Sequence, residues 1–188
     1  MRNVRIIAVV VVAVLIGISV PLMGVGAVNQ SSSSRPFSAQ LSGQQAVPPI
    51  STRASGQATF MLSSDGKELG YKLDVSNIDN VTMAHIHLAP AGKNGPIVVW
   101  LYSGPTKTGG FSGTLAEGTI TAADLRGQLA GKTIADLVKE IDAGNAYVNV
   151  HTEKYPAGEI RGQIQPGQAG GQPGTAPGGQ SGGTGGGY

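Results

Sequence analysis

Short segments with β-strand character, separated by turn residues at regular spacing, fill the middle of this chain and restrict the folds open to it. This pattern is typical of an antiparallel sandwich or barrel. An α/β fold would need a helix after each strand, and the sequence has room for one or two helices in total. We therefore expect an all-β fold of about eight strands. The expected strands are 37–46, 56–63, 68–75, 82–88, 96–102, 113–119, 146–152 and 159–165.

One amphipathic helix is expected near residues 133–143. Thr133 can cap its N-terminus, and Gly144 can end it. Between them, apolar residues recur at i, i+3, i+4 and i+7, which is the spacing of one helix face. These residues are Ile134, Leu137, Val138 and Ile141. The sequence therefore predicts a single helix that covers part of the sheet.

Residues 6–28 form an uncharged, strongly apolar run of 23 residues that follows Arg2 and Arg5. As a helix this run would reach roughly 34 Å, enough to cross a hydrocarbon core of about 30 Å. Positive charge before the run keeps the N-terminus inside and sends the following residues out. Residues 1–28 are thus expected to be a cleaved signal peptide or a retained membrane anchor. Both alternatives predict a secreted or cell-surface protein with its domain outside.

Two further segments lack the apolar residues that a folded core needs. Residues 29–36 read NQSSSSRP and are expected to be a Ser-rich linker. Residues 166–188 are rich in Gly and Pro and carry no charge, which predicts a disordered tail. Residues 37–165 are therefore expected to form the one folded domain.

Charge and cysteine content exclude two classes of protein. Beyond Arg5, eleven basic residues balance eleven acidic ones. Binding to nucleic acid requires a clustered excess of Lys and Arg, so no nucleic-acid partner is expected. The chain contains no cysteine, which excludes disulfides and thiolate metal sites.

The chain has three histidines, and all lie in expected strands. Strand alternation places His85 and His87 on one face, opposite apolar neighbours. In a later strand the same alternation places Tyr147, Asn149 and His151 on the less apolar face. If the two strands are neighbours, the three imidazoles converge on the outer face of the sheet. Zn²⁺ and Cu²⁺ both accept such neutral nitrogen ligands.

A simpler interpretation of these histidines stays open. On a half-solvated face they can form hydrogen bonds across strands or to loops without any ligand. A catalytic histidine would need a nucleophile or a carboxylate placed against it, and no spacing in the sequence has that form. We therefore predict no catalytic residues, and an enzymatic role is not favoured.

Two turn-rich segments, 89–96 and 155–158, flank the histidine strands. Proline fixes φ and Asn-Gly allows positive φ, so 89–96 is expected to be a rigid loop. Such loops either form part of a ligand site or only connect strands. The candidate ligand-binding residues are Asn94, Tyr147, Asn149 and Glu153.

The histidine segments carry a resemblance to a known family. Residues 85–102, HIHLAPAGKNGPIVVWLY, and 145–164, NAYVNVHTEKYPAGEIRGQI, resemble the CHRD (chordin-type) domain. The resemblance implies an extracellular antiparallel β-sandwich, immunoglobulin-like or superoxide-dismutase-like, with no enzymatic activity established for the family. The His-x-His strand is also similar to the copper site of Cu,Zn superoxide dismutase. This chain departs from that site because it has three histidines and no cysteine pair.

The favoured hypothesis is an exported or membrane-anchored CHRD-domain protein that acts as a non-enzymatic extracellular binding module. Its partner, an extracellular protein or glycan, is unknown, and residues 1–28 would contact the membrane if they are not cleaved. A second hypothesis is a copper- or zinc-binding protein that uses His85, His87 and His151. A third is a structural cell-envelope protein.

Overall fold

The computed structural model of this protein describes residues 34–167. The expected signal peptide or anchor, residues 29–33 of the Ser-rich linker and residues 168–188 of the tail lie outside the described residues. For these residues the three expectations stay predictions. Arg35 and Pro36, the last two residues of the expected linker, belong instead to the first strand, because they pair with the strand that follows. Within residues 34–167, no helix is both long enough and apolar enough to cross a membrane.

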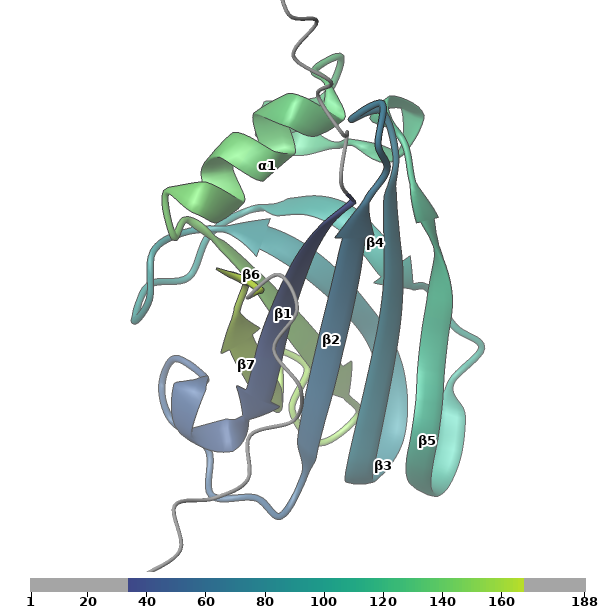
Figure 1. Ribbon diagram of the computed structural model, residues 1–188. Coiled ribbons are helices and arrows are strands. Elements are labelled where there is room, and N and C mark those ends of the chain that lie inside the picture. Colours follow the sequence, from purple (N-terminus) through teal and green to yellow (C-terminus); the bar gives the residue numbers. More distant parts are fainter. Residues whose placement is uncertain (1–33, 168–188) are drawn as a thin grey trace, which may run out of the picture. The chain divides into compact units, whose positions relative to one another are not determined.

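The described chain is an all-β fold with a single α-helix, as the sequence predicted (Figure 1). Its strands are antiparallel and belong to one eight-stranded sheet. They are β1 (Arg35–Ser42), β2 (Ser55–Leu62), β3 (Leu69–Leu88), β4 (Ile97–Tyr102), β5 (Lys107–Ile120), β6 (Ala146–Thr152), β7 (Ile160–Gln163) and β8 (Gln165–Pro166). The helix is α1 (Ile134–Asp142), and three short 3₁₀ turns occupy Gly43–Gln45, Ala122–Asp124 and Gly127–Leu129.

Strand β3 closes the sheet on itself. Its first half pairs with β2 and β5, and its second half pairs with β6 and β4. The path from β6 through β7 and β1 returns to β2, so the strands form a closed barrel. The expected sandwich differs from this arrangement, because one bent strand belongs to both halves and no break separates two sheets.

The sequence predicted two strands, 68–75 and 82–88, where the structure has the single strand β3. The residues between them include Asn77 and Asn80, which take left-handed conformations with φ of 52° and 47°. Register shifts in the β3–β5 pairing occur at the same place. Asparagine tolerates this conformation better than most residues, so the polar stretch bends the strand without ending it.

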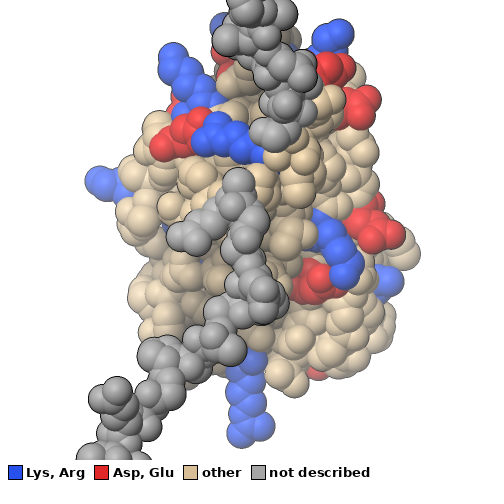
Figure 2. Space-filling view, viewed as in Figure 1, with Lys and Arg blue, Asp and Glu red and all other residues tan. Residues whose placement is uncertain are grey.

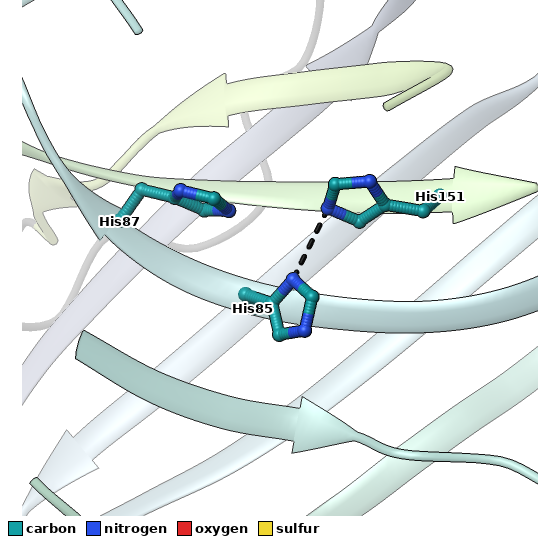
Figure 3. Close-up of side chains that lie close together, drawn as sticks. All are labelled: His85, His87 and His151. Atoms are coloured by element: carbon teal, nitrogen blue, oxygen red, sulfur yellow. Dashed lines mark hydrogen bonds between the residues drawn. The ribbon is translucent and has the colours of Figure 1, made fainter. Parts of the chain in front are cut away.

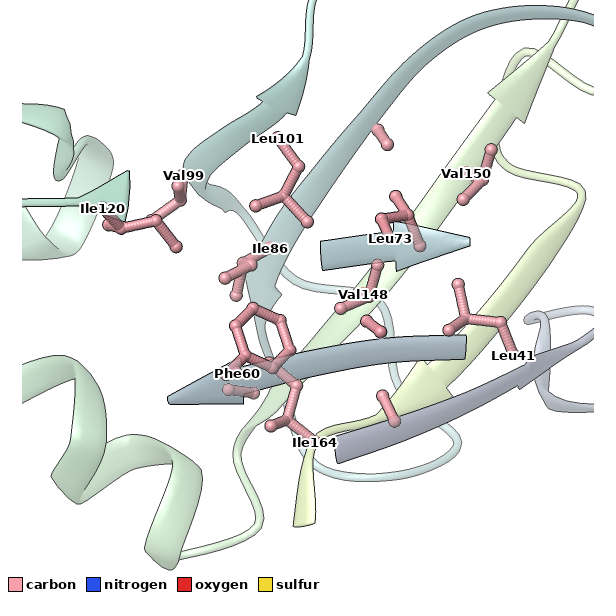
Figure 4. Packing of buried hydrophobic residues seen from close by; sticks show 14 of the residues in the cluster. Leu41, Phe60, Leu73, Ile86, Val99, Leu101, Ile120, Val148, Val150 and Ile164 are labelled. Atoms are coloured by element: carbon pink, nitrogen blue, oxygen red, sulfur yellow. The ribbon is translucent and has the colours of Figure 1, made fainter. Parts of the chain in front are cut away.

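The core fills the inside of the closed sheet (Figure 4). Alternate residues of β3 and β6, such as Ile86 and Val148, point into it and are fully buried. Helix α1 lies at one end of the sheet, and its four expected apolar residues are buried in the same core. The predicted cap is present, because Thr133 Oγ1 accepts a hydrogen bond from the Asp136 N–H and the Asp136 carboxylate accepts from the Thr133 N–H.

Charged side chains of both signs are interspersed on the surface. On the face shown in Figure 2, Lys and Arg lie beside Asp and Glu, with no extended patch of one sign. Two ion pairs, Arg35 with Asp142 and Lys72 with Asp74, are partly exposed. Pairs of this kind contribute little to stability.

We predict that the bend in β3 depends on the left-handed conformation of Asn77. Replacing Asn77 with valine should lower the free energy of unfolding by about 1–2 kcal/mol, because a β-branched residue disfavours positive φ. Asn77→Gly should change it by less than about 0.5 kcal/mol. The Asn77 backbone N–H donates to Ser112 Oγ, a bond that both substitutions keep. Urea unfolding of both variants measures the difference, and equal effects of valine and glycine would contradict this account.

Candidate metal centre

The three histidines lie on neighbouring strands, as their sequence positions allowed. Strands β3 and β6 pair with His85 opposite Asn149, His87 opposite Tyr147 and Met83 opposite His151. All these side chains belong to the face of the sheet that points away from the core. One donor atom from each histidine lies within 4.8 Å of the others. In Figure 3 the His85 ring lies between the other two, and the three rings face a common space.

The histidines are buried, whereas the sequence predicted that they lie on a half-solvated face. Their exposed fractions are 0% for His85, 8% for His87 and 7% for His151. Two loops cover the cluster, since the Gly95 carbonyl contacts His87 and the Pro156 carbonyl contacts His151. Alternation along a strand identifies its two faces, but it does not show which loops fold over them.

The loop carbonyls determine which ring nitrogen carries the proton. His87 Nδ1 lies 2.9 Å from the Gly95 oxygen, and His151 Nδ1 lies 2.9 Å from the Pro156 oxygen. Because a carbonyl oxygen only accepts, both Nδ1 atoms are protonated and both Nε2 atoms keep a lone pair. His85 Nδ1 then donates to His151 Nε2 at 3.1 Å, so His85 Nε2 also keeps its lone pair. Within the described residues, the buried Nε2 atoms of His85 and His87 have no hydrogen-bond partner.

Burial keeps the cluster uncharged at neutral pH. It lowers the pKa of His85 from 6.5 to about 3, and the neighbouring charges of His151 and His87 add to this effect. Burial also lowers the pKa of His87, an effect that its bond to the Gly95 carbonyl opposes. The pKa of His151 is lowered by burial and raised in part by the Pro156 carbonyl. Neutral imidazole is the form that binds metal ions.

Arg161 supports the loop that covers His87. Its guanidinium is buried and donates to the carbonyl oxygens of Pro90 at 3.2 Å and Lys93 at 2.8 Å. It also lies 3.5 Å from the centre of the Tyr147 ring. Tyr147 in turn stacks on His87 with ring centres 5.0 Å apart, and its hydroxyl accepts from the Gly95 N–H. Arg161 and Tyr147 therefore hold the carbonyl that fixes the His87 tautomer.

Trp100 covers the remaining side of His85. The two rings meet edge to face with centres 4.2 Å apart, although 47% of Trp100 is exposed. Trp100 and Arg161 were not predicted from the sequence as site residues. The available signal was the alternation in 96–102 and in 159–165, where each occupies a position on the less apolar face.

The four candidate ligand-binding residues occupy different positions around the cluster. Tyr147 contacts His87 directly, as described above. Asn94 donates to the Val47 carbonyl, and Asn149 donates to the Ala157 carbonyl, so both hold loops. Glu153 is exposed and is not part of the group of converging donor atoms.

A hollow on the surface contains none of the histidines. It has a volume of about 960 Å³ and a mostly polar lining that includes Arg53, Asp79, Lys154 and Glu159. The Glu159 carboxylate there already accepts from two threonine hydroxyls. Unpartnered buried nitrogens occur at the histidines, so we assign the candidate site to them.

The geometry suits a metal ion after a small adjustment. A tetrahedral ion with metal–nitrogen bonds near 2.0 Å needs donor atoms roughly 3.3 Å apart. His85 Nδ1 and His151 Nε2 are already 3.1 Å apart. An ion bound between them would replace the proton on His85 Nδ1, which would move to His85 Nε2. The whole group, within 4.8 Å, requires a shift of one ring by roughly 1–2 Å.

Comparison with known proteins gives one family and one curated relative. The model of the CHRD domain matches residues 37–164. Chordin from Xenopus laevis is 31% identical over 132 residues, which cover 66% of this chain and 12% of chordin. The chain thus spans about an eighth of that relative's length. No solved structure matches the chain.

We predict that acid destabilises the metal-free protein through these histidines. Their pKa values are lower in the folded than in the unfolded chain, so stability is complete above about pH 6.5 and falls as the pH drops toward 3. Between pH 7.5 and pH 5, His85 takes up a proton in the unfolded chain but not in the folded one. This difference alone should lower the free energy of unfolding by roughly 2 kcal/mol. Urea unfolding in the presence of a chelator measures this decline.

The control for this pH dependence is the variant His85→Gln, which keeps a polar side chain but does not titrate. Its free energy of unfolding should fall less over the same interval. Carboxylates such as Asp74 and Asp124 have lowered pKa values and contribute mainly below about pH 4. An identical decline in wild type and variant would show that His85 is not kept neutral by the fold.

Proposed function

This chain belongs to the CHRD domain family, and on that premise we propose that it is an exported, non-enzymatic module that binds one copper or zinc ion through His85, His87 and His151. One observation carries the proposal. Two loop carbonyls fix the Nδ1 atoms of His87 and His151, so that their unprotonated Nε2 atoms face the space beside His85. Metal-binding histidines usually have this second hydrogen bond.

The unpartnered nitrogens favour a ligand over a purely structural role. A buried polar atom without a partner costs about 1–3 kcal/mol, and His85 and His87 each have one. Apolar residues at these positions would avoid that cost. A metal ion between the rings would use the lone pair of His87 Nε2 and, once the His85 proton has moved to Nε2, that of His85 Nδ1.

Export is supported by the N-terminal sequence and by the family. The apolar run that follows Arg2 and Arg5 has the character of an export signal or anchor. The family model and the similarity to chordin are consistent with an extracellular domain. Because the chain spans 12% of chordin, the activity of that whole protein does not transfer to this one.

The broader hypotheses stay predictions. Membership of the family agrees with a binding module, while its protein or glycan partner is not identified by any contact in the described residues. A structural role in the cell envelope is equally untested. Both are compatible with a bound metal ion, because the histidines are buried and leave the outer surface to other contacts.

We predict that the full chain, purified without a histidine tag, binds about one equivalent of copper or zinc. Trp100 is the single tryptophan of the protein and lies against His85, so its fluorescence should change as the ion binds. The triple variant His85→Ala, His87→Ala, His151→Ala should retain no ion after dialysis. Elemental analysis and fluorescence titration measure both quantities.

Glu153→Gln provides the matched control, because Glu153 is an exposed acidic residue outside the cluster. It should bind the ion with unchanged affinity. If wild type binds neither metal above the background of the triple variant, the proposed function is wrong.

We also predict a role for the Tyr147 hydroxyl in positioning His87. Tyr147→Phe keeps the ring that stacks on His87 but removes the acceptor for the Gly95 N–H. Metal affinity should fall by about tenfold, the usual effect of losing such support. Tyr71→Phe removes a hydroxyl bonded to the Leu101 carbonyl and serves as control. Equal affinities of the two variants in a competition titration would contradict the positioning role.

A further inference from the structure

A methionine also lies on the histidine face of β3. Met83 precedes His85 by two residues, so its side chain belongs to the same face. In the pairing of β3 with β6 it stands directly opposite His151. Side chains so placed have Cβ atoms roughly 4.5–5.5 Å apart. Met83 is half-buried, and its unbranched thioether adapts easily to the position of a neighbour.

The charges around the cluster favour an ion of low charge. In the part of the chain that the structure describes, no carboxylate belongs to the group of converging donors. The buried Glu159 carboxylate accepts from Thr52 and Thr152 hydroxyls at 2.6 and 2.8 Å. The buried guanidinium of Arg161 lies against Tyr147, whose ring stacks on His87. A divalent ion beside this fixed positive charge would be less stable than a monovalent one, because burial weakens screening.

The soft thioether of Met83 and the positive charge of Arg161 favour the same kind of ion, which is soft and carries a single charge. Thioether sulfur selects Cu(I) among the metals that imidazole accepts, while Zn²⁺ gains little from it. Cu(I) carries a single charge, and three or four ligands satisfy it. We propose that this site selects cuprous copper over zinc, with Met83 Sδ as an additional ligand beside the three imidazoles. This inference rests on the proposed function, since it specifies the ion for the same site.

The test is a pair of competition titrations on the full chain without a tag. Under anaerobic conditions, Cu(I) is titrated against bicinchoninate, and Zn²⁺ is titrated against a chromophoric zinc chelator. Met83→Leu replaces the thioether with a hydrocarbon of similar size. It should weaken Cu(I) binding by about tenfold or more and leave Zn²⁺ affinity within about twofold. Met61→Leu is the matched control, because Met61 is exposed on β2, and it should change neither affinity.

X-ray absorption at the copper edge gives a second, independent measurement. The Cu(I) complex of the wild type should show one sulfur neighbour that is missing in Met83→Leu. The urea midpoint of the metal-free variant should match that of wild type, which separates ligand loss from unfolding.

The possible outcomes distinguish the two proposals. If wild type binds neither metal, the proposed function itself fails. If wild type binds an ion but holds zinc as tightly as Cu(I), or if its Cu(I) complex has no sulfur neighbour, the cuprous inference is overturned while metal binding stands.

Discussion

Both the closed sheet and the histidine cluster depend on the pairing of one long strand, β3, with four neighbours. Its first half joins β2 to β5, and its second half joins β6 to β4. The bend at Asn77 and Asn80 lets the strand curve with the closed sheet while it stays paired with its neighbours. The same continuity aligns β6 with β3, so that His151 lies near His85. The strand pairing that closes the sheet therefore also brings the histidines together.

Local rules were sufficient for most of the fold. Period-two alternation located the strands, and the i, i+3, i+4, i+7 spacing located α1 with its Thr133 cap. These rules could not predict that the sheet closes on itself, because closure depends on whether a polar stretch ends a strand or bends it. Asn77 and Asn80 were compatible with both outcomes, and contacts with β5 decide between them.

The sequence predicted which histidines form the candidate site, but not which groups surround them. Alternation identified the face that His85, His87 and His151 share, and it also placed Tyr147 and Asn149 there. It could not predict burial, since the covering groups come from loops and from distant strands. Gly95 and Pro156 act through backbone carbonyls, which leave no periodic signal in the sequence. Alternation places Arg161 on the less apolar face, but it does not show that its side chain reaches the loop over His87. Fixing the tautomers of the rings required these tertiary contacts.

The position of the cluster across β3 and β6 has a mechanical consequence. His85 and His151 are 66 residues apart in a chain that has no cysteine. An ion held by both would tie the two strands together and close a loop that the unfolded chain leaves open. By the loop-entropy relation, a permanent link of this span restricts the unfolded chain by about 4 kcal/mol. Unlike a disulfide, this cross-link would form and dissolve with the supply of metal, so that resistance to unfolding would follow the metal content of the surroundings.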